Sequence, residues 1–143
     1  MQILKVDTER RRIGNLGERA AARYLRKNGY KILSRNFVAE GKEIDIIAID
    51  KENLVFCEVK ARTEDSSSLS KAEPRPASAV TPKKQMGIID ASRAFLRTRG
   101  NLGRHIRFDC IEVYLTKHRL TRRVNRIVHM KAAFNLDTAR SRK

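Results

Sequence analysis

Residues 41–62 read GKEIDIIAIDKENLVFCEVKAR. Apolar residues, many of them β-branched, fill both halves of this stretch, and the halves are separated by the polar run Asp50-Lys51-Glu52-Asn53. Such a pattern is typical of two strands joined by a short turn. The sequence therefore predicts a β-hairpin with strands at 42–50 and 54–61, which we expect at the centre of a sheet.

The hairpin also carries information on its own register. A turn centred between residues 51 and 52 pairs residues whose numbers sum to 103, so Asp45 would lie opposite Glu58 and Glu43 opposite Lys60. One face of the hairpin is then wholly apolar: Ile44, Ile46, Ala48, Val55, Cys57, Val59 and Ala61. The other face is apolar near the turn and then becomes charged: Ile47, Ile49, Leu54 and Phe56, followed by Glu43, Asp45, Glu58, Lys60 and Arg62. A slip of one residue would turn the acidic residues into the core, so the pattern favours this register.

Two directly opposed carboxylates predict a specific kind of site. Cβ atoms of opposed residues lie about 5 Å apart, so the charges of Asp45 and Glu58 would repel each other. A divalent cation between them relieves the repulsion, because carboxylate oxygens are the ligands that Mg²⁺ prefers. Lys60 points the same way and could stabilise charge on a phosphoryl oxygen, so the set is suited to metal-assisted phosphodiester hydrolysis. The alternative is a solvated strand end with an ordinary Glu–Lys pairing.

The rest of the chain alternates helical and strand patterns, which predicts a single α/β domain over 1–143 with a central sheet flanked by helices. The expected elements are a helix at 14–28, a strand at 30–38, a helix from Pro82 to Arg99 capped by Thr81, strands at 106–115 and 123–130, and a short closing helix at 131–136. Three segments are expected to be mobile: the ends 1–12 and 138–143, and the Ser- and Pro-rich loop 62–80.

Composition limits the classes of partner. The 143 residues include 32 Lys and Arg against 16 Asp and Glu, a net charge of +16. Such a surface attracts phosphate backbones through counterion release, so we expect a nucleic-acid partner; a generic basic surface, or binding to ribosomes or membranes, is the alternative. Aromatic residues are few, which favours recognition of backbone shape over base stacking. No apolar run is long enough to span a membrane and the start lacks a secretion signal, so a soluble cytoplasmic protein is expected.

Three positions outside the hairpin also invite interpretation. Glu18 lies at the rim of the apolar stripe of the first helix, where it is either a site residue or an ordinary first-turn acid. Lys84 shares a helical face with Ile88, so it could point over the sheet towards the acidic residues. Asp109 lies in an apolar strand beside Arg107, and we interpret it as half of a structural ion pair.

The hairpin resembles a known motif. Residues 41–45 (GKEID) and 55–62 (VFCEVKAR) resemble the signature of the PD-(D/E)xK nuclease superfamily, whose members have a restriction-endonuclease-like fold. A closer resemblance, to the small bacterial YraN-like family of uncharacterised proteins, covers nearly the whole chain. It rests on further residues: Gly14-Asn15-Leu16-Gly17-Glu18, Ala21, Leu25, Asn36, Val80-Thr81, Lys84-Gln85, Arg107-Phe108-Asp109 and Ala133-Phe134. The layout is also similar to that of archaeal Holliday-junction resolvases.

The resemblance implies a three-layer fold with a mixed sheet of about five strands, and a homodimer as in the junction resolvases. It also implies roles for single residues: Asp45 and Glu58 as metal ligands, the Val59 carbonyl as a further ligand, Lys60 as the catalytic lysine, Glu18 as an additional acid, and Glu43, Arg62, Lys84 and Gln85 as auxiliary or nucleic-acid-binding residues. We therefore expect a Mg²⁺- or Mn²⁺-dependent endonuclease-like protein acting on structured or branched DNA, with DNA favoured over RNA. The alternative is a nucleic-acid-binding module that keeps the fold but performs no chemistry.

Overall fold

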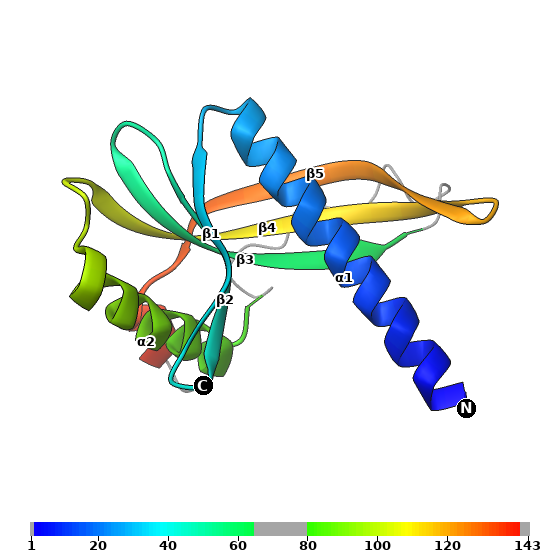
Figure 1. Cartoon of the computed structure of the whole chain (residues 1–143), viewed down its shortest axis with the longest axis horizontal. Helices are drawn as coiled ribbons and strands as arrows, with labels where there is room; N and C mark the ends of the chain where they lie inside the picture. Colours follow the sequence, from blue (N-terminus) through cyan, green and yellow to red (C-terminus); the bar gives the residue numbers. More distant parts are fainter. Residues whose placement is uncertain (1, 65–79, 141–143) are drawn as a thin grey trace.

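The computed structural model describes residues 2–64 and 80–140, with side chains from Thr8 onward. It has the predicted α/β architecture, a five-stranded mixed sheet flanked by helices (Figure 1). In chain order the elements are α1 (Gln2–Lys27), β1 (Lys31–Ala39), β2 (Lys42–Ile49), β3 (Asn53–Thr63), α2 (Pro82–Arg99), β4 (His105–His118), β5 (Thr121–Phe134) and α3 (Leu136–Arg140).

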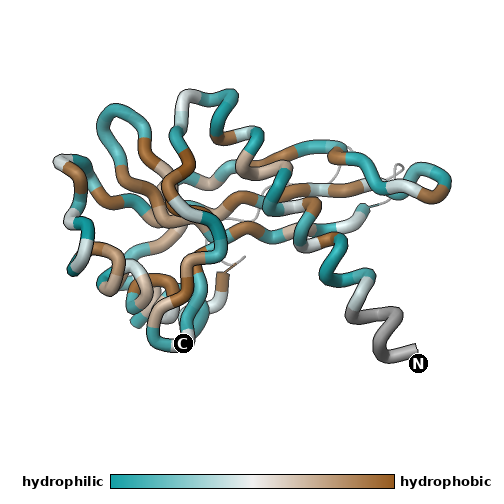
Figure 2. The backbone as a smooth tube through the Cα atoms, in the orientation of Figure 1, coloured by the Kyte–Doolittle hydropathy of each residue, from teal (hydrophilic) through white to brown (hydrophobic). Residues whose placement is uncertain are grey.

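The sheet has the strand order β1-β2-β3-β4-β5. Neighbouring strands are antiparallel except β3 and β4, which are parallel and joined by a crossover that contains α2. One apolar core lies between the sheet and α1, and a second lies between the sheet and the pair α2 and α3. Apolar residues accordingly concentrate along the central strands, while the turns and the outer faces of the helices are hydrophilic (Figure 2). The chain is therefore arranged in three layers, as expected.

The hairpin forms as predicted near its turn. Asp50 Oδ1 accepts hydrogen bonds from the backbone N–H groups of Glu52 at 2.9 Å and Asn53 at 2.7 Å, which holds the turn. Four residue pairs, from Ile49–Leu54 to Ile46–Cys57, follow the predicted sum of 103. This part of the predicted register is confirmed.

Beyond Cys57 the two strands separate, and here the prediction is wrong. The pairing of β2 with β3 ends at Ile46–Cys57, so Asp45 and Glu58 are not a directly opposed cross-strand pair. Figure 1 shows β2 turning towards α2 while β3 continues alongside β4. The cause is packing: Ile44 enters the core with α2 instead of sharing the core of Ile46 as predicted. The charged residues of the two strands consequently lie beyond the last residue pair of the hairpin.

Several predicted boundaries also differ from the structure. Helix α1 begins at Gln2 and not near residue 14, so segment 1–12, expected to be a loose arm, is helical from its second residue. Its arginines and Glu9 are good helix formers. The predicted closing helix at 131–136 is wrong: β5 continues to Phe134, and α3 begins only at Leu136.

The other elements agree more closely. Helix α2 begins at Pro82 with Thr81 as its N-cap, whose hydroxyl accepts the N–H of Lys84 at 3.2 Å. Strand β3 continues to Thr63, and most of the loop predicted to be mobile, 65–79, lies outside the described residues, as does 141–143. No described helix is both long and apolar enough to cross a membrane.

Candidate metal centre

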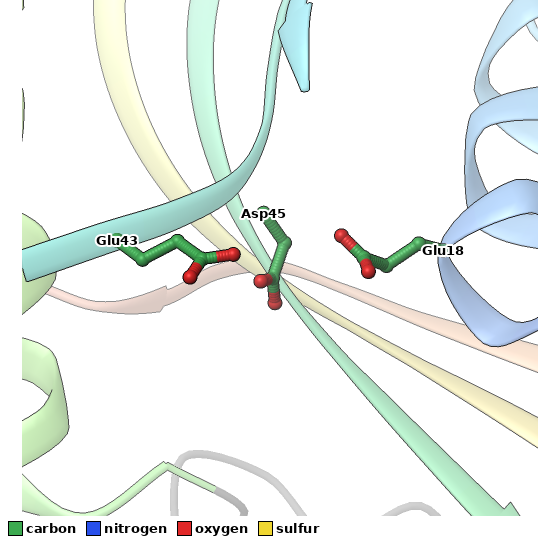
Figure 3. Close-up of side chains that lie close together, drawn as sticks. All are labelled: Glu18, Glu43 and Asp45. Carbon is green, nitrogen blue, oxygen red and sulfur yellow. The ribbon is translucent and has the colours of Figure 1, made fainter. Parts of the chain in front are cut away.

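Three carboxylates meet where β2 leaves β3. Glu18 comes from α1, and Glu43 and Asp45 come from β2; one ligand oxygen of each lies within 4.8 Å of the others. Figure 3 shows Asp45 between Glu43 and Glu18, with all three side chains pointing towards one another. We call these three residues the acidic cluster. Glu43 and Asp45 are two residues apart in the part of β2 that no longer pairs with β3.

A glycine brings Glu18 to the cluster. Helix α1 crosses β3 at Gly17, where a Cβ atom would lie 2.8 Å from Cβ of Ala61. Only glycine allows the helix to approach the strand this closely, because real Cβ atoms do not come so near each other. The next residue of the helix, Glu18, is thereby held beside β2.

Asn36 of β1 joins two members of the cluster. Its neighbours Arg35 and Phe37 pair with Ile46 and Ile44, which places it across from Asp45. With its amide nitrogen turned towards the carboxylates, it donates hydrogen bonds to Glu18 Oε1 at 2.7 Å and to Glu43 Oε1 at 3.0 Å. Its backbone φ is 55°, a left-handed conformation that asparagine tolerates better than most residues. The sequence reasoning did not identify Asn36 as a site residue; its only signal was a place in the family pattern.

Glu58 lies in β3, outside the acidic cluster, and is 4% exposed. Its Oε1 atom is 3.8 Å from Nζ of Lys60 and 3.9 Å from Nζ of Lys84, whereas Oε2 is buried without a hydrogen-bond partner. Burial, and secondarily the charge of Asp45, raise the pKa of Glu58 to about 7. A buried carboxylate with an unsatisfied oxygen is costly, which makes Glu58 the most unusual acid of the described chain.

The acidic cluster carries similar electrostatic strain. Burial raises the pKa of Asp45, and the charge of Glu43 adds to this, although a hydrogen bond from the Val59 N–H at 2.8 Å acts in the opposite direction. Burial and the charge of Asp45 likewise raise the pKa of Glu18. A divalent cation would relieve the repulsion, since hard cations take carboxylate and amide oxygens. The donor set and the unsatisfied Glu58 Oε2 therefore fit Mg²⁺ or Mn²⁺.

The structure places the remaining predicted site residues in different surroundings. Lys60 and Lys84 both lie beside Glu58, as expected from their positions on β3 and α2. Arg62 directs its guanidinium to the fully buried Glu112, with Nε 2.6 Å from Oε2. Gln85 is buried; its amide donates to the Val80 carbonyl and accepts from the Thr138 hydroxyl, which ties α2 to α3. The contacts of Arg62 and Gln85 are thus structural ones, and a ligand role for the Val59 carbonyl stays a prediction.

A basic hollow adjoins the acidic cluster. It has a volume of about 360 Å³ and lies between the β1–β2 turn and the start of α2. Glu43 lines it together with three lysines, Lys42, Lys83 and Lys84. Phosphate groups next to the carboxylates would meet these ammonium groups.

The Asp109 group lies apart from the site. Fully buried, Asp109 accepts two hydrogen bonds from Arg107, both at 2.9 Å, and a third from the Ala132 N–H at 2.9 Å. Its Oδ2 is also 2.7 Å from Nε2 of His129. The predicted structural ion pair is confirmed.

Comparison with known proteins places the chain in a family. Residues 17–113 match the model of the uncharacterised protein family UPF0102. The chain belongs to the UPF0102 family. It is 40% identical over 122 residues to a UPF0102 protein of Caldanaerobacter subterraneus subsp. tengcongensis, an alignment that covers 85% of this chain and 93% of the relative. It is 36% identical over 125 residues to one of Pelotomaculum thermopropionicum (87% and 97% covered) and 43% identical over 101 residues to one of Clostridium perfringens strain SM101 (71% and 78% covered).

These matches confirm the family that the sequence resembles, and the names of the UPF0102 relatives carry no activity. The segment matched to UPF0102 includes every carboxylate of the site, from Glu18 to Glu58, and both lysines beside Glu58. It ends within β4, before β5 begins. The family match therefore covers the candidate metal centre in full.

Proposed function

We propose that this UPF0102 chain is a Mg²⁺- or Mn²⁺-dependent nuclease that hydrolyses phosphodiester bonds in structured or branched DNA. One observation carries the proposal: Glu58 is buried beside two lysines with one oxygen unsatisfied, and the charge of Asp45, a member of the acidic cluster, acts on its pKa. Carboxylates that gather with raised pKa values beside lysines are suited to a metal-assisted reaction.

The residues of the site would have distinct roles. Asp45 and Glu58 would hold the metal ion, with Glu18 and Glu43 as further oxygen donors and Asn36 fixing the last two in place. When bound, the ion would lower the pKa of a coordinated water and neutralise charge on the phosphoryl group. Lys60, beside Glu58, would orient the attacking water or stabilise a phosphoryl oxygen.

Charge supports a nucleic-acid substrate. The chain carries +16, and three lysines line the hollow that adjoins Glu43. A phosphate next to the scissile one would lie in this hollow, which holds the backbone in register without reading bases. The preference for branched DNA over RNA rests on the resemblance to junction resolvases.

Cleavage assays test the proposal directly. Branched, flapped and single-stranded DNA would be incubated with the wild type and with Asp45→Asn and Glu58→Gln in the presence of Mn²⁺. We expect cleavage of a branched substrate that each substitution lowers by about 100-fold or more. Glu52→Gln is the matched control, because Glu52 is exposed in the hairpin turn and away from the cluster. Equal cleavage by the wild type and both site variants would refute the proposal.

A non-catalytic nucleic-acid-binding module is the second candidate, favoured by the fact that two lysines already lie beside Glu58. In that case DNA binding would be salt-sensitive, independent of Mn²⁺ and unchanged by Asp45→Asn.

The expected homodimer is tested by sedimentation, and the expected cytoplasmic location by imaging of the tagged chain.

A further inference from the structure

A second concave surface lies between α1 and the edge strand β5, away from the acidic cluster. Its volume is about 620 Å³. The floor is formed by Leu16, Ala20, Tyr24, Val124 and Ile127, and the rim by Arg19, Arg23 and Lys27. We call this surface the α1–β5 groove. None of the described residues that line it is acidic.

The groove and the acidic cluster lie on opposite edges of α1. Successive helical residues are rotated by about 100°, so Ala20 in the groove is about 200° around the helix from Glu18. A ligand in the groove therefore does not contact the carboxylates. The groove is a separate feature of the molecule.

A β-bulge supplies one wall of the groove. Between the pairs Tyr114–Arg126 and Leu115–Val124 the register of β4 and β5 shifts by one residue. Residues three apart in a regular strand face opposite sides, but the extra residue lets Val124 and Ile127 face α1 together. Val124 remains 46% exposed, an unusual exposure for a valine on a sheet face beside a helix.

Two contacts hold the groove open in a fixed shape. Near the start of α1, Glu9 pairs with Arg122 of β5. Further along, the Tyr24 hydroxyl lies 3.1 Å from Nδ1 of His129, which is itself bonded to Asp109. The two contacts are 15 residues apart, or about 22 Å of helix. The helix is therefore attached to β5 on both sides of the exposed floor.

We propose that the α1–β5 groove binds a segment of a partner protein in which aliphatic side chains are flanked by acidic ones. The basic rim residues Arg19, Arg23 and Lys27 are spaced four residues apart and form a line about 12 Å long on one side of the floor. Carboxylates of the partner would pair with this line. Aliphatic side chains would cover the floor and remove Val124 and Ile127 from water.

Charge and chemistry argue against two other occupants. A second copy of the chain would bring another net charge of +16 to a rim that is already basic. Single-stranded nucleic acid stacks its bases on aromatic rings, but the floor is mostly aliphatic and the hydroxyl of its one tyrosine is bonded to His129. An acidic, aliphatic polypeptide matches both the rim and the floor.

Selection from a library of random 16-residue peptides on the full-length chain tests the proposal. We expect enriched peptides that combine Asp or Glu with Leu, Ile, Val or Met. Their affinity should fall about tenfold for Val124→Ser, which removes aliphatic surface from the exposed floor without disturbing the core. It should also fall for the double variant Arg19→Ala/Arg23→Ala, whereas Arg93→Ala/Arg99→Ala on α2, which has the same net charge, should bind like the wild type.

Three results would overturn the proposal. The first is enrichment of peptides without any acidic and aliphatic combination. The second is equal weakening by the two double variants, which would mean that binding depends on net charge alone. The third is displacement of the selected peptides by duplex DNA or by anionic phospholipid vesicles, if the DNA or the vesicles also bind Val124→Ser more weakly than the wild type. The groove would then bind nucleic acid or membrane surfaces. None of these measurements involves DNA cleavage, so they test the groove proposal independently of the nuclease proposal.

Discussion

Gly17 of α1 and Ala61 of β3 lie in such close contact that a Cβ on the glycine would be only 2.8 Å from Cβ of the alanine. This contact sets the distance between the first helix and the sheet. It also fixes the position of Glu18, one residue further along, in the acidic cluster. A packing requirement and a site requirement are thus met by one glycine.

Gly17→Ala should lower stability and weaken metal binding together. The added methyl group forces α1 away from β3, at a cost of about 1–3 kcal/mol, and moves Glu18 away from Asp45. Gly14→Ala is the matched control on the same helix, because a Cβ there meets nothing within 4 Å. That change should leave Mn²⁺ affinity unaltered and raise stability by up to about 1 kcal/mol. Urea unfolding and Mn²⁺ titration measure both effects; equal behaviour of the two variants would show that the close contact has no role.

Stability should depend on pH through Glu58. Its pKa rises from 4.5 to about 7 on folding, mainly because it is buried. The folded chain thus keeps a proton that the unfolded chain loses, so stability falls as the pH rises from about 4.5 to about 7 and then levels off. Glu58→Gln removes this dependence and should gain up to about 3 kcal/mol on the wild type between pH 4.5 and pH 8. Unfolding curves at several pH values provide the test, and parallel pH profiles for the two proteins would contradict it.

Substitution of Asn36 should lower metal affinity more than it lowers stability. Asn36→Gly removes the amide that joins Glu18 and Glu43 while keeping the left-handed backbone that this position requires. Without the amide the two carboxylates are no longer oriented, and Mn²⁺ affinity should fall about 10- to 100-fold. Glu40→Gly is the control, because Glu40 has a similar φ of 54° but lies in the exposed β1–β2 turn outside the cluster. Calorimetric titration of both variants would reveal a purely structural role if their affinities were equal.

Asp109→Asn should lower the free energy of unfolding, independently of any effect on the metal site. The substitution leaves Arg107 beside an uncharged amide in the interior, at a cost of about 3–5 kcal/mol. Although burial alone would raise it, the pKa of Asp109 is lowered by hydrogen bonds from His129, Arg107 and the Ala132 N–H. Its contribution is therefore present above about pH 4 and lost at lower pH, the opposite direction to that of Glu58. Acid unfolding of the wild type and variant checks this, and identical acid midpoints would contradict it.

The sequence predicts most of the fold because the relevant signals are local. Alternating apolar residues and the turn at Asp50 determine the hairpin, and Thr81-Pro82 marks the start of α2. The separation of β2 from β3 before Ile46 has no local signal, because it results from the packing of Ile44 against α2. The early start of α1 has no clear signal either, since residues 7–12 are all polar and interrupt any apolar stripe between Val6 and Leu16.

The residues of the candidate site likewise divide into those with a local sequence signal and those without one. Glu43 and Asp45 are two residues apart, so the strand pattern alone places them on one face. Glu18 was identified mainly through the family resemblance, because its approach depends on the contact of Gly17 with β3. The sequence does not reveal the role of Asn36, because this role depends on a positive φ and on two carboxylates from different elements. Residues whose function depends on tertiary contacts of this kind cannot be recognised from spacing.

Calorimetric titration with Mn²⁺, in the absence of DNA, is the most direct test of the proposed metal centre. The wild type should give a saturable isotherm, Asp45→Asn should abolish it, and the turn variant Glu52→Gln should reproduce the wild-type curve. Asp45 is decisive because it lies between Glu18 and Glu43 and also acts on the pKa of Glu58. Absence of binding by the wild type, or binding that Asp45→Asn leaves unchanged, would contradict the assignment of these carboxylates to a metal ion.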